Sequence, residues 1–261
     1  MPNLSRLFAL TLLAACHAVF ADLPVVREHY PLGDTAAVGI ARYCVAGSAE
    51  SDGRVLLYQP HENETTARRT ALAVLATRGR GCLLALEQHG RRRIAFDTAD
   101  GRADFDPNRI YTAQGRAATL ARGGNSGAEA QYLTAAFADT LLTRYLARTR
   151  LIIAVHNNTD GATDIERYLN GGLGSAEVFI NPGHDPDDYV FTIDAAAFAY
   201  FKAHGFNVVR QDNDTVPDDG SLSVYAARHG IGYINVEAQY GHTDAQAAML
   251  QAALAFAGGD D

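Results

Sequence analysis

The chain has 261 residues, of which 48% are hydrophobic and 20% are charged, a composition typical of globular proteins. This length suits one compact domain, whose core is large enough to need no disulfide scaffold. The formal net charge of −8 lacks the basic excess that nucleic-acid binding requires, so we expect no nucleic-acid partner.

The first 21 residues have the pattern of an export signal. Arg6 supplies a positive charge, residues 7–15 form a short apolar run, and residues 19–21 (VFA) offer small side chains at the cleavage positions. This run is shorter than the roughly 20 residues that cross a bilayer, and no later stretch is apolar enough to do so. We therefore expect an exported, periplasmic protein whose mature chain is residues 22–261. The alternative is a membrane-anchored lipoprotein lipidated at Cys16, because residues 13–16 (LAAC) resemble a lipobox.

With either kind of processing, Cys44 and Cys82 are the only cysteines besides Cys16. An even pair in an exported protein favours a disulfide, because the compartment outside the cytoplasm is oxidising. Two buried free thiols are the alternative. A metal site is not indicated, since the two residues lie far apart and neither belongs to a Cys-x-x-Cys pair.

Beyond the signal, short β-rich runs alternate with segments of helical periodicity. Several of the runs are continuously apolar, as strands covered on both faces should be. Such alternation predicts a single α/β domain, with a mostly parallel or mixed central sheet and helices on both faces. In chain order, strands are predicted at residues 37–41, 55–59, 82–86, 93–97, 151–156, 189–193, 206–210 and 231–236, and helices at 66–77, 128–148, 195–204, 221–229 and 244–257.

Polar residues follow three of these strands at the point where each strand ends. His61 and Glu64 come just after the strand at 55–59, His156 ends the strand at 151–156, and Glu237 follows the strand at 231–236. Ligands bind beyond the carboxyl ends of the strands in an open α/β sheet. If the strands are parallel neighbours, the four side chains converge at one edge of the sheet.

Two imidazoles and one carboxylate form a ligand set with a definite chemistry. Two nitrogen ligands and one oxygen ligand leave a fourth position for water, which is the pattern of a catalytic zinc. The pKa of a water bound in this way falls to near 7. Glu237 is then placed to take the proton of that water and pass it to a leaving amine. The His61-x-x-Glu64 spacing is weak by itself, because it recurs by chance.

The order of motifs along the chain strengthens this interpretation. His61-x-x-Glu64 is followed by residues 106–109 (DPNR), then by His156 and finally by Glu237. This series resembles that of the zinc carboxypeptidase family, and more closely its succinylglutamate desuccinylase/aspartoacylase branch. That branch has a similar Asp-x-Asn-Arg element with an upstream Arg, and a His-Asn-x-Thr run like residues 156–159.

The resemblance implies a carboxypeptidase-like fold and one zinc ion per chain. It implies that His61, Glu64 and His156 bind the zinc and that Glu237 is the general base. Arg102 is implied to polarise the scissile carbonyl, although one of Arg91, Arg92 and Arg93 is an alternative for that role. Asn108 and Arg109 are implied to bind a substrate carboxylate, which a planar guanidinium matches well.

One departure from the family stands beside the third zinc ligand. Many members carry an Asp two residues before that ligand, where this chain has Ala154. The group that orients His156 must therefore come from elsewhere.

Three functions remain open. We expect hydrolysis of an amide next to a free carboxylate, in a small or cell-wall peptide. Deacylation of an N-acyl amino acid would use the same residues. A non-catalytic carboxylate-binding protein on this fold is the third hypothesis; Ala154 favours it, whereas Glu237 speaks against it.

Overall fold

The computed structural model describes residues 23–34, 36–48 and 54–258. The predicted signal at residues 1–21 and the lipidation site Cys16 lie outside these ranges. Within them, no helix has the length and apolar character that a membrane crossing requires.

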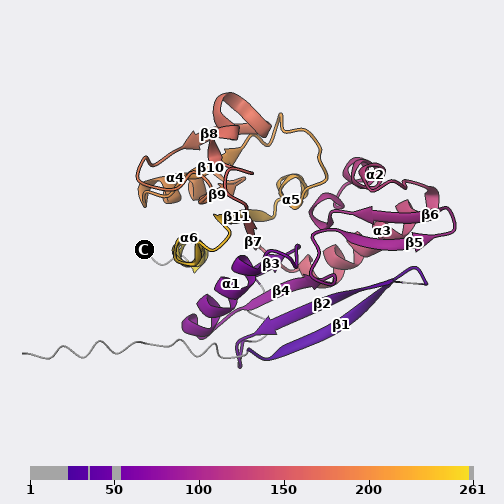
Figure 1. Ribbon diagram of the computed structural model, residues 1–261. Helices are drawn as coiled ribbons and strands as arrows, with labels where there is room; N and C mark the ends of the chain where they lie inside the picture. The colour runs from indigo at the N-terminus through magenta and orange to yellow at the C-terminus, as the bar shows by residue number, and fades with distance from the viewer. Residues whose placement is uncertain (1–22, 35, 49–53, 259–261) are drawn as a thin grey trace, which may run out of the picture.

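Nine strands form one mixed sheet, in the order β1-β2-β4-β3-β7-β11-β9-β10-β8, and β5 and β6 form a separate hairpin (Figure 1). The centre of the sheet is parallel, because β3 pairs in parallel with both β4 and β7, and β7 with β11. The strands are β1 (Val25–Leu32), β2 (Ala36–Cys44), β3 (Val55–Gln59), β4 (Cys82–Glu87), β5 (Ile94–Thr98), β6 (Gly101–Phe105), β7 (Leu151–Asn158), β8 (Ser175–Phe179), β9 (Tyr189–Thr192), β10 (Val208–Gln211) and β11 (Gly232–Gln239).

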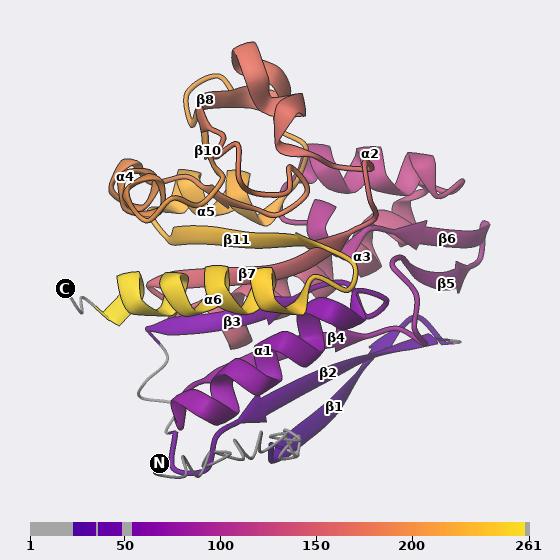
Figure 2. The ribbon, with the colours of Figure 1, turned by 60° about the vertical axis from the view of Figure 1, so that its left-hand side comes forward.

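Helices cover both faces of the sheet (Figure 2). One core packs α1, α4 and α6 against one face, and the other packs α2, α3, α5 and the β5–β6 hairpin against the opposite face. The α-helices are α1 (Thr65–Arg78), α2 (Ala113–Arg122), α3 (Ala128–Thr140), α4 (Ala195–Ala203), α5 (Leu222–His229) and α6 (Thr243–Gly258). Two 3-10 segments, η2 (Pro107–Arg109) and η4 (Ile165–Gly174), and a π-helical turn, η3 (Leu141–Leu146), complete the elements used below.

The predicted fold class is confirmed, in its mixed form. All eight predicted strands are present, and so are the five predicted helices, with the helix at 128–148 divided into α3 and the π-helical turn η3. Strands β1, β6 and β8 and helix α2 were not predicted. Cys44 and Cys82 are neighbours across β2 and β4 and form a disulfide, as the pairing hypothesis expected.

Candidate metal centre

The three parallel strands β3, β7 and β11 end at the same edge of the sheet. His61 and Glu64 lie in the turn between β3 and α1, and His156 lies near the end of β7. The register of β7 and β11 places Glu237 directly beside His156. The predicted convergence of these four residues is therefore present in the structure.

His61, Glu64 and His156 form a buried cluster, in which the possible ligand atoms lie within 4.8 Å of one another. The Nδ1 atoms of the two imidazoles are 3.3 Å apart. The Glu64 carboxylate bridges them, with Oε1 2.9 Å from Nδ1 of His61 and Oε2 2.8 Å from Nδ1 of His156. The relative exposures of the three residues are 0%, 2% and 4%, so the cluster is shielded from bulk water.

Side-chain amides hold the turn and the strand together. Nε2 of Gln59 donates to the carbonyls of His61 and Glu64, which fixes the backbone between the two residues. Oδ1 of Asn157 accepts from the amides of Thr66 and Ala67 in the first turn of α1. Because these amides have no partner within the helix, Asn157 caps α1. It thereby ties the start of α1 to the residue that follows His156.

Asp106 fixes the tautomer of His61. Nε2 of His61 lies 2.8 Å from Oδ1 of Asp106, and an ionised carboxylate only accepts hydrogen bonds. Glu64 faces Nδ1 in the same way, so a metal ion would have to displace a proton from Nδ1; the one remaining proton would then sit on Nε2, with the Nδ1 lone pair directed into the cluster. Partner groups of this kind orient metal-binding histidines.

The cluster fits a tetrahedral divalent metal. Nitrogen ligands about 2.05 Å from such an ion would lie roughly 3.3 Å from each other. The two Nδ1 atoms have this separation, and Glu64 supplies the oxygen ligand between them. A set of two imidazoles and one carboxylate suits zinc, and it leaves a coordination position open.

The ionisation states agree with this ligand set. Although burial works against its charge, the imidazoles of His156 and His61 hold the pKa of Glu64 well below its usual range. Burial lowers the pKa of His156, which favours the neutral form that binds metals. The pKa of His61 is raised despite burial, because the Glu64 and Asp106 carboxylates favour its cation. A bound metal ion would compete with that proton.

Glu237 stands beside the cluster and is not part of it. Its side chain belongs to the same row as His156 on β7 and Tyr189 on β9. Burial, followed by the negative charge of Glu64, raises the pKa of Glu237 to about 8. Asn235 donates from Nδ2 to Oε2 of Glu237 over 3.4 Å, which favours the ionised form. A carboxylate with such a pKa can exchange protons near neutrality.

Arg102 and, as an alternative, one of Arg91, Arg92 and Arg93 are predicted to polarise the carbonyl, and Arg92 and Arg102 lie in different surroundings. Arg92 is half exposed, with Nη1 2.7 Å from Oε1 of Glu64 and Nη2 3.4 Å from Oδ2 of Asp106. Arg102 is exposed on β6, opposite Asp97 in the β5–β6 hairpin. Among the described interactions, none joins Arg102 to the cluster. Arg92 is therefore the arginine in contact with the candidate centre.

The loop that carries Arg92 is fixed by two side chains that the motif series does not include. Glu62 accepts hydrogen bonds from the amides of Gln88 and Gly90. Nε2 of Gln88 donates to the carbonyls of Pro60 and Arg92, which joins this loop to the turn before His61. In the sequence, the only signal was the basic run at residues 91–93.

Asn108 and Arg109 follow Asp106 in the short turn η2. Oδ1 of Asn108 accepts from the amide of Leu222 at the start of α5, over 3.4 Å. Arg109 donates from Nη1 to the carbonyl of Asn108 and lies within 3.4 Å of an Asp219 oxygen. Its side chain is 33% exposed, so a ligand could reach the guanidinium.

The Ala154 departure has a visible consequence. Asp106 orients His61, but Nε2 of His156 is buried without a hydrogen-bond partner in the described part of the chain. His156 is held instead through its backbone carbonyl, which accepts from Gln246, and through Nδ1.

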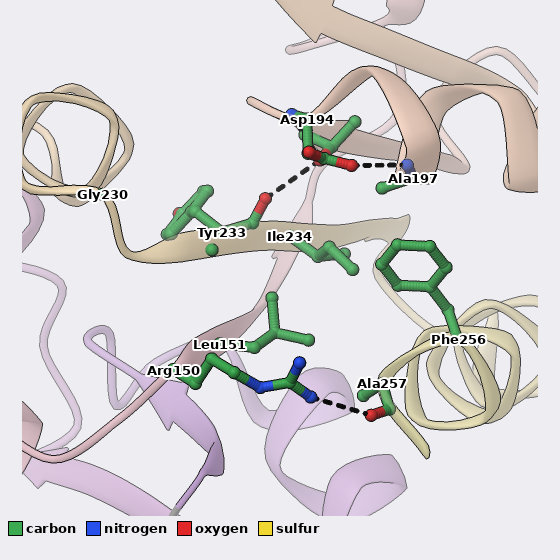
Figure 3. Close-up of a pocket in the computed structure, with 11 residues that line it drawn as sticks. Arg150, Leu151, Asp194, Ala197, Gly230, Tyr233, Ile234, Phe256 and Ala257 are labelled. Carbon is green, nitrogen blue, oxygen red and sulfur yellow. Dashed lines mark hydrogen bonds between the residues drawn. The ribbon is translucent and has the colours of Figure 1, made fainter. Parts of the chain in front are cut away.

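The structure contains two further candidate sites. Asp185, Asp188 and His242 form a second group with ligand atoms within 4.8 Å of one another, and His242 pairs with Asp188 at 2.9 Å. A cavity of about 310 Å³ lies at the opposite edge of the sheet, where β7 and β11 begin (Figure 3). Its charged side chains are used structurally, since Asp194 caps α4 and Arg150 donates to the carbonyl of Ala257.

No protein-family model matches the sequence, and no curated protein does so either. Solved structures with a similar fold include a murein-tripeptide amidase from Escherichia coli O157, at 12% identity over 90% of this chain and 95% of that chain, with a TM-score of 0.48. A succinylglutamate desuccinylase/aspartoacylase from Rhodobacter sphaeroides has 16% identity over 94% and 68%, with a TM-score of 0.44. An aspartoacylase family protein from Mesorhizobium loti has 14% identity over 92% and 68%, with a TM-score of 0.44.

At such identities and TM-scores the likeness concerns the course of the chain. The roles of individual residues follow from the geometry of this chain alone.

Proposed function

We propose that this protein is a metal-dependent hydrolase, with zinc as its metal, that cleaves an amide bond near a free carboxylate. The observation that carries the proposal is the convergence of two imidazole Nδ1 atoms and one carboxylate in a buried cluster beside Glu237. His61, Glu64 and His156 hold the ion, one per chain. When bound, it supplies Lewis acidity to a water molecule and to the scissile carbonyl.

The residues around the cluster have separable roles. Glu237 accepts a proton from the attacking water and delivers it to the leaving amine, which a pKa near neutrality favours. Arg92 polarises the carbonyl, because its guanidinium lies at the cluster, in the role that the sequence alone assigned first to Arg102. Asn108 and Arg109 bind the substrate carboxylate, and Arg109 provides the charge.

We also propose that the protein acts outside the cytoplasm. The export pattern of residues 1–21 supports this location, and so does the Cys44–Cys82 disulfide, since disulfides persist in oxidising compartments. Small or cell-wall peptides are then more accessible substrates than cytoplasmic N-acyl amino acids, which are the alternative.

Metal content and turnover test the proposal together. The chain from Asp22 onward is saturated with zinc, freed of excess ion and analysed for metal, alongside His156→Ala and Glu237→Gln. We expect about one zinc in the parent and in Glu237→Gln, and little in His156→Ala. Turnover of a panel of peptides and N-acyl amino acids should occur in the parent and fall by at least about 100-fold in Glu237→Gln. Equal turnover in parent and Glu237→Gln contradicts the proposed base.

A binding protein that retains the fold is the second candidate. Nε2 of His156 has no hydrogen-bond partner among the described residues, and this favours the binding protein, because catalytic metal sites usually orient every histidine ligand. Zinc-independent binding of carboxylate ligands, with no turnover of any panel member, would support this candidate over the hydrolase.

A further inference from the structure

Arg109 pairs with the carboxylate of Asp219, and both side chains remain partly exposed to solvent. Nε of Arg109 lies 3.4 Å from Oδ2 of Asp219, and the two side chains are 33% and 47% exposed. A positive and a negative group thus stand side by side near the metal centre. Arg109 belongs to the same short turn as Asp106, which contacts His61 of the cluster.

Close backbone packing fixes Asp219 at this position. Gly220 adopts a left-handed conformation, with φ of +77°, and a Cβ on it would lie 2.4 Å from the carbonyl oxygen of Arg109. The amide of Tyr111 donates to the Gly220 carbonyl over 3.1 Å. The amide of Ser221 donates to Oδ1 of Asp219 over 2.9 Å, which leaves Oδ2 directed towards Arg109. The loop before α5 and the turn before α2 are therefore joined at the pair.

An α-amino acid head group carries one negative and one positive charge, which can face the Arg109 guanidinium and the Asp219 carboxylate respectively. Its carboxylate and its ammonium are bonded to one carbon, so they reach two neighbouring groups of a protein at once. A guanidinium binds the carboxylate as a fork, and an aspartate accepts from the ammonium. A ligand with a carboxylate alone meets repulsion from Asp219, so the pair discriminates between the two.

We propose that Arg109 and Asp219 together bind a free α-amino acid head group, with the α-carboxylate on Arg109 and the α-ammonium on Asp219. This inference rests on the proposed function for its link to catalysis, and it narrows the substrate class. In an ordinary peptide, the α-nitrogen of the last residue is the scissile amide nitrogen and carries no charge. A substrate with a free head group is instead cleaved at an amide on its side chain, as in an Nε-acyl-lysine.

Equilibrium binding tests the pair without any turnover. Norleucine and hexanoate share a carbon chain and a carboxylate and differ only in the α-ammonium. Both are titrated by calorimetry into the parent, Asp219→Asn and the control Asp214→Asn, which alters an exposed aspartate of the same loop. Asparagine can still accept from the Ser221 amide, so the loop is expected to fold.

We expect the parent to bind norleucine about five times more tightly than hexanoate, the scale of a partly exposed ion pair. Asp219→Asn should bring that ratio close to one, and Asp214→Asn should leave it unchanged. Equal weakening of both ligands in Asp219→Asn would mean that Asp219 only positions Arg109, and it would overturn the proposal. A parent that does not prefer norleucine would overturn it as well.

Turnover then separates this inference from the proposed function. The zinc-loaded parent is given Nε-acetyl-lysine and its isomer Nα-acetyl-lysine, which lacks the α-ammonium. Faster cleavage of the Nε isomer, with the preference lost in Asp219→Asn, supports both proposals. Faster cleavage of the Nα isomer overturns the head-group assignment and leaves the hydrolase intact. If neither isomer nor the wider panel is cleaved while norleucine keeps its preference, the hydrolase fails and the head-group site stands.

Discussion

His61 lies between two carboxylates that act on different ring atoms. Glu64 faces Nδ1, where a metal would bind, and Asp106 faces Nε2, where the proton is held. Since a neutral imidazole carries one proton, the second contact decides whether the first nitrogen is free to act as a ligand. We therefore expect the metal affinity of the candidate centre to depend on Asp106, which would not itself touch the metal.

Replacing Asp106 with alanine tests this dependence. The His61 ring would lose its fixed orientation and tautomer, and we expect the zinc dissociation constant to rise about 10- to 100-fold. Competition with a chromophoric chelator measures that constant. Asp139→Asn, which removes an exposed carboxylate on α3, controls for the loss of charge alone. An unchanged constant in Asp106→Ala would show that His61 is oriented by other contacts.

The pH dependence of hydrolysis should follow Glu237. Only its ionised form accepts a proton, so kcat/KM should fall as the pH falls through its pKa. In the metal-free protein that pKa is about 8, raised by burial and by the charge of Glu64. Because a bound cation offsets the charge of Glu64, the acid limb of the zinc enzyme should lie below this value. A pH–rate profile measures the acid limb of the zinc enzyme. An NMR titration measures the pKa of Glu237 in the metal-free protein for comparison. Undiminished activity at acid pH would exclude Glu237 as the base.

At the scale of elements, continuous apolar runs were the reliable signal. The strand at 55–59 has the predicted limits, and β7 and β11 extend a few residues beyond theirs because polar residues continue the pairing. The edge strand β1 was missed, since polar and apolar residues share its sequence VVREHYPL and only one neighbour pairs with it. Helix α2 was missed because it contains Gly115 and only one large apolar side chain, Leu120, which weakens its pattern; Gly115 is needed there for contact with Gly220.

Strand ends also explain which site residues could be predicted from the sequence. His61, His156 and Glu237 occupy strand ends, and parallel pairing is enough to bring strand ends together. The position of Arg92 depends on the course of a loop that Glu62 and Gln88 hold in place by hydrogen bonds to its backbone. No local pattern encodes such contacts, so the contact of Arg92 with the cluster could not be predicted from the sequence.

The Cys44–Cys82 disulfide links β2 and β4 where β4 begins. The candidate metal centre lies at the opposite end of the parallel strands, where β3 and β7 end. It closes a loop with a sequence separation of 38, and this constraint should contribute about 2–4 kcal/mol to the free energy of unfolding. We expect the double variant Cys44→Ser, Cys82→Ser to lose that amount in urea denaturation while still binding one zinc. Loss of zinc together with stability would mean that the two edges of the sheet are coupled.

Across the whole molecule, the candidate metal centre joins parts of the chain that are distant in sequence. Glu64 and His156 are separated by 92 positions in the sequence. Glu64 follows strand β3 and His156 lies in β7, and these two strands pair at the middle of the sheet. The unfolded chain cannot present these ligands together, so an ion that binds the folded form stabilises it by mass action.

Zinc should therefore raise the stability of the entire domain. At a free concentration about 100 times the dissociation constant, the free energy of unfolding should increase by about 2.7 kcal/mol. For a domain of this size that corresponds to a rise in Tm of roughly 5–10 °C, measurable by calorimetry. His156→Ala should show almost no rise, whereas Asp188→Asn, which alters the second cluster with Asp185 and His242, should respond like the parent. A rise in Tm that persists in His156→Ala and disappears in Asp188→Asn would place the stabilising ion at the second cluster. It would contradict metal binding by His61, Glu64 and His156.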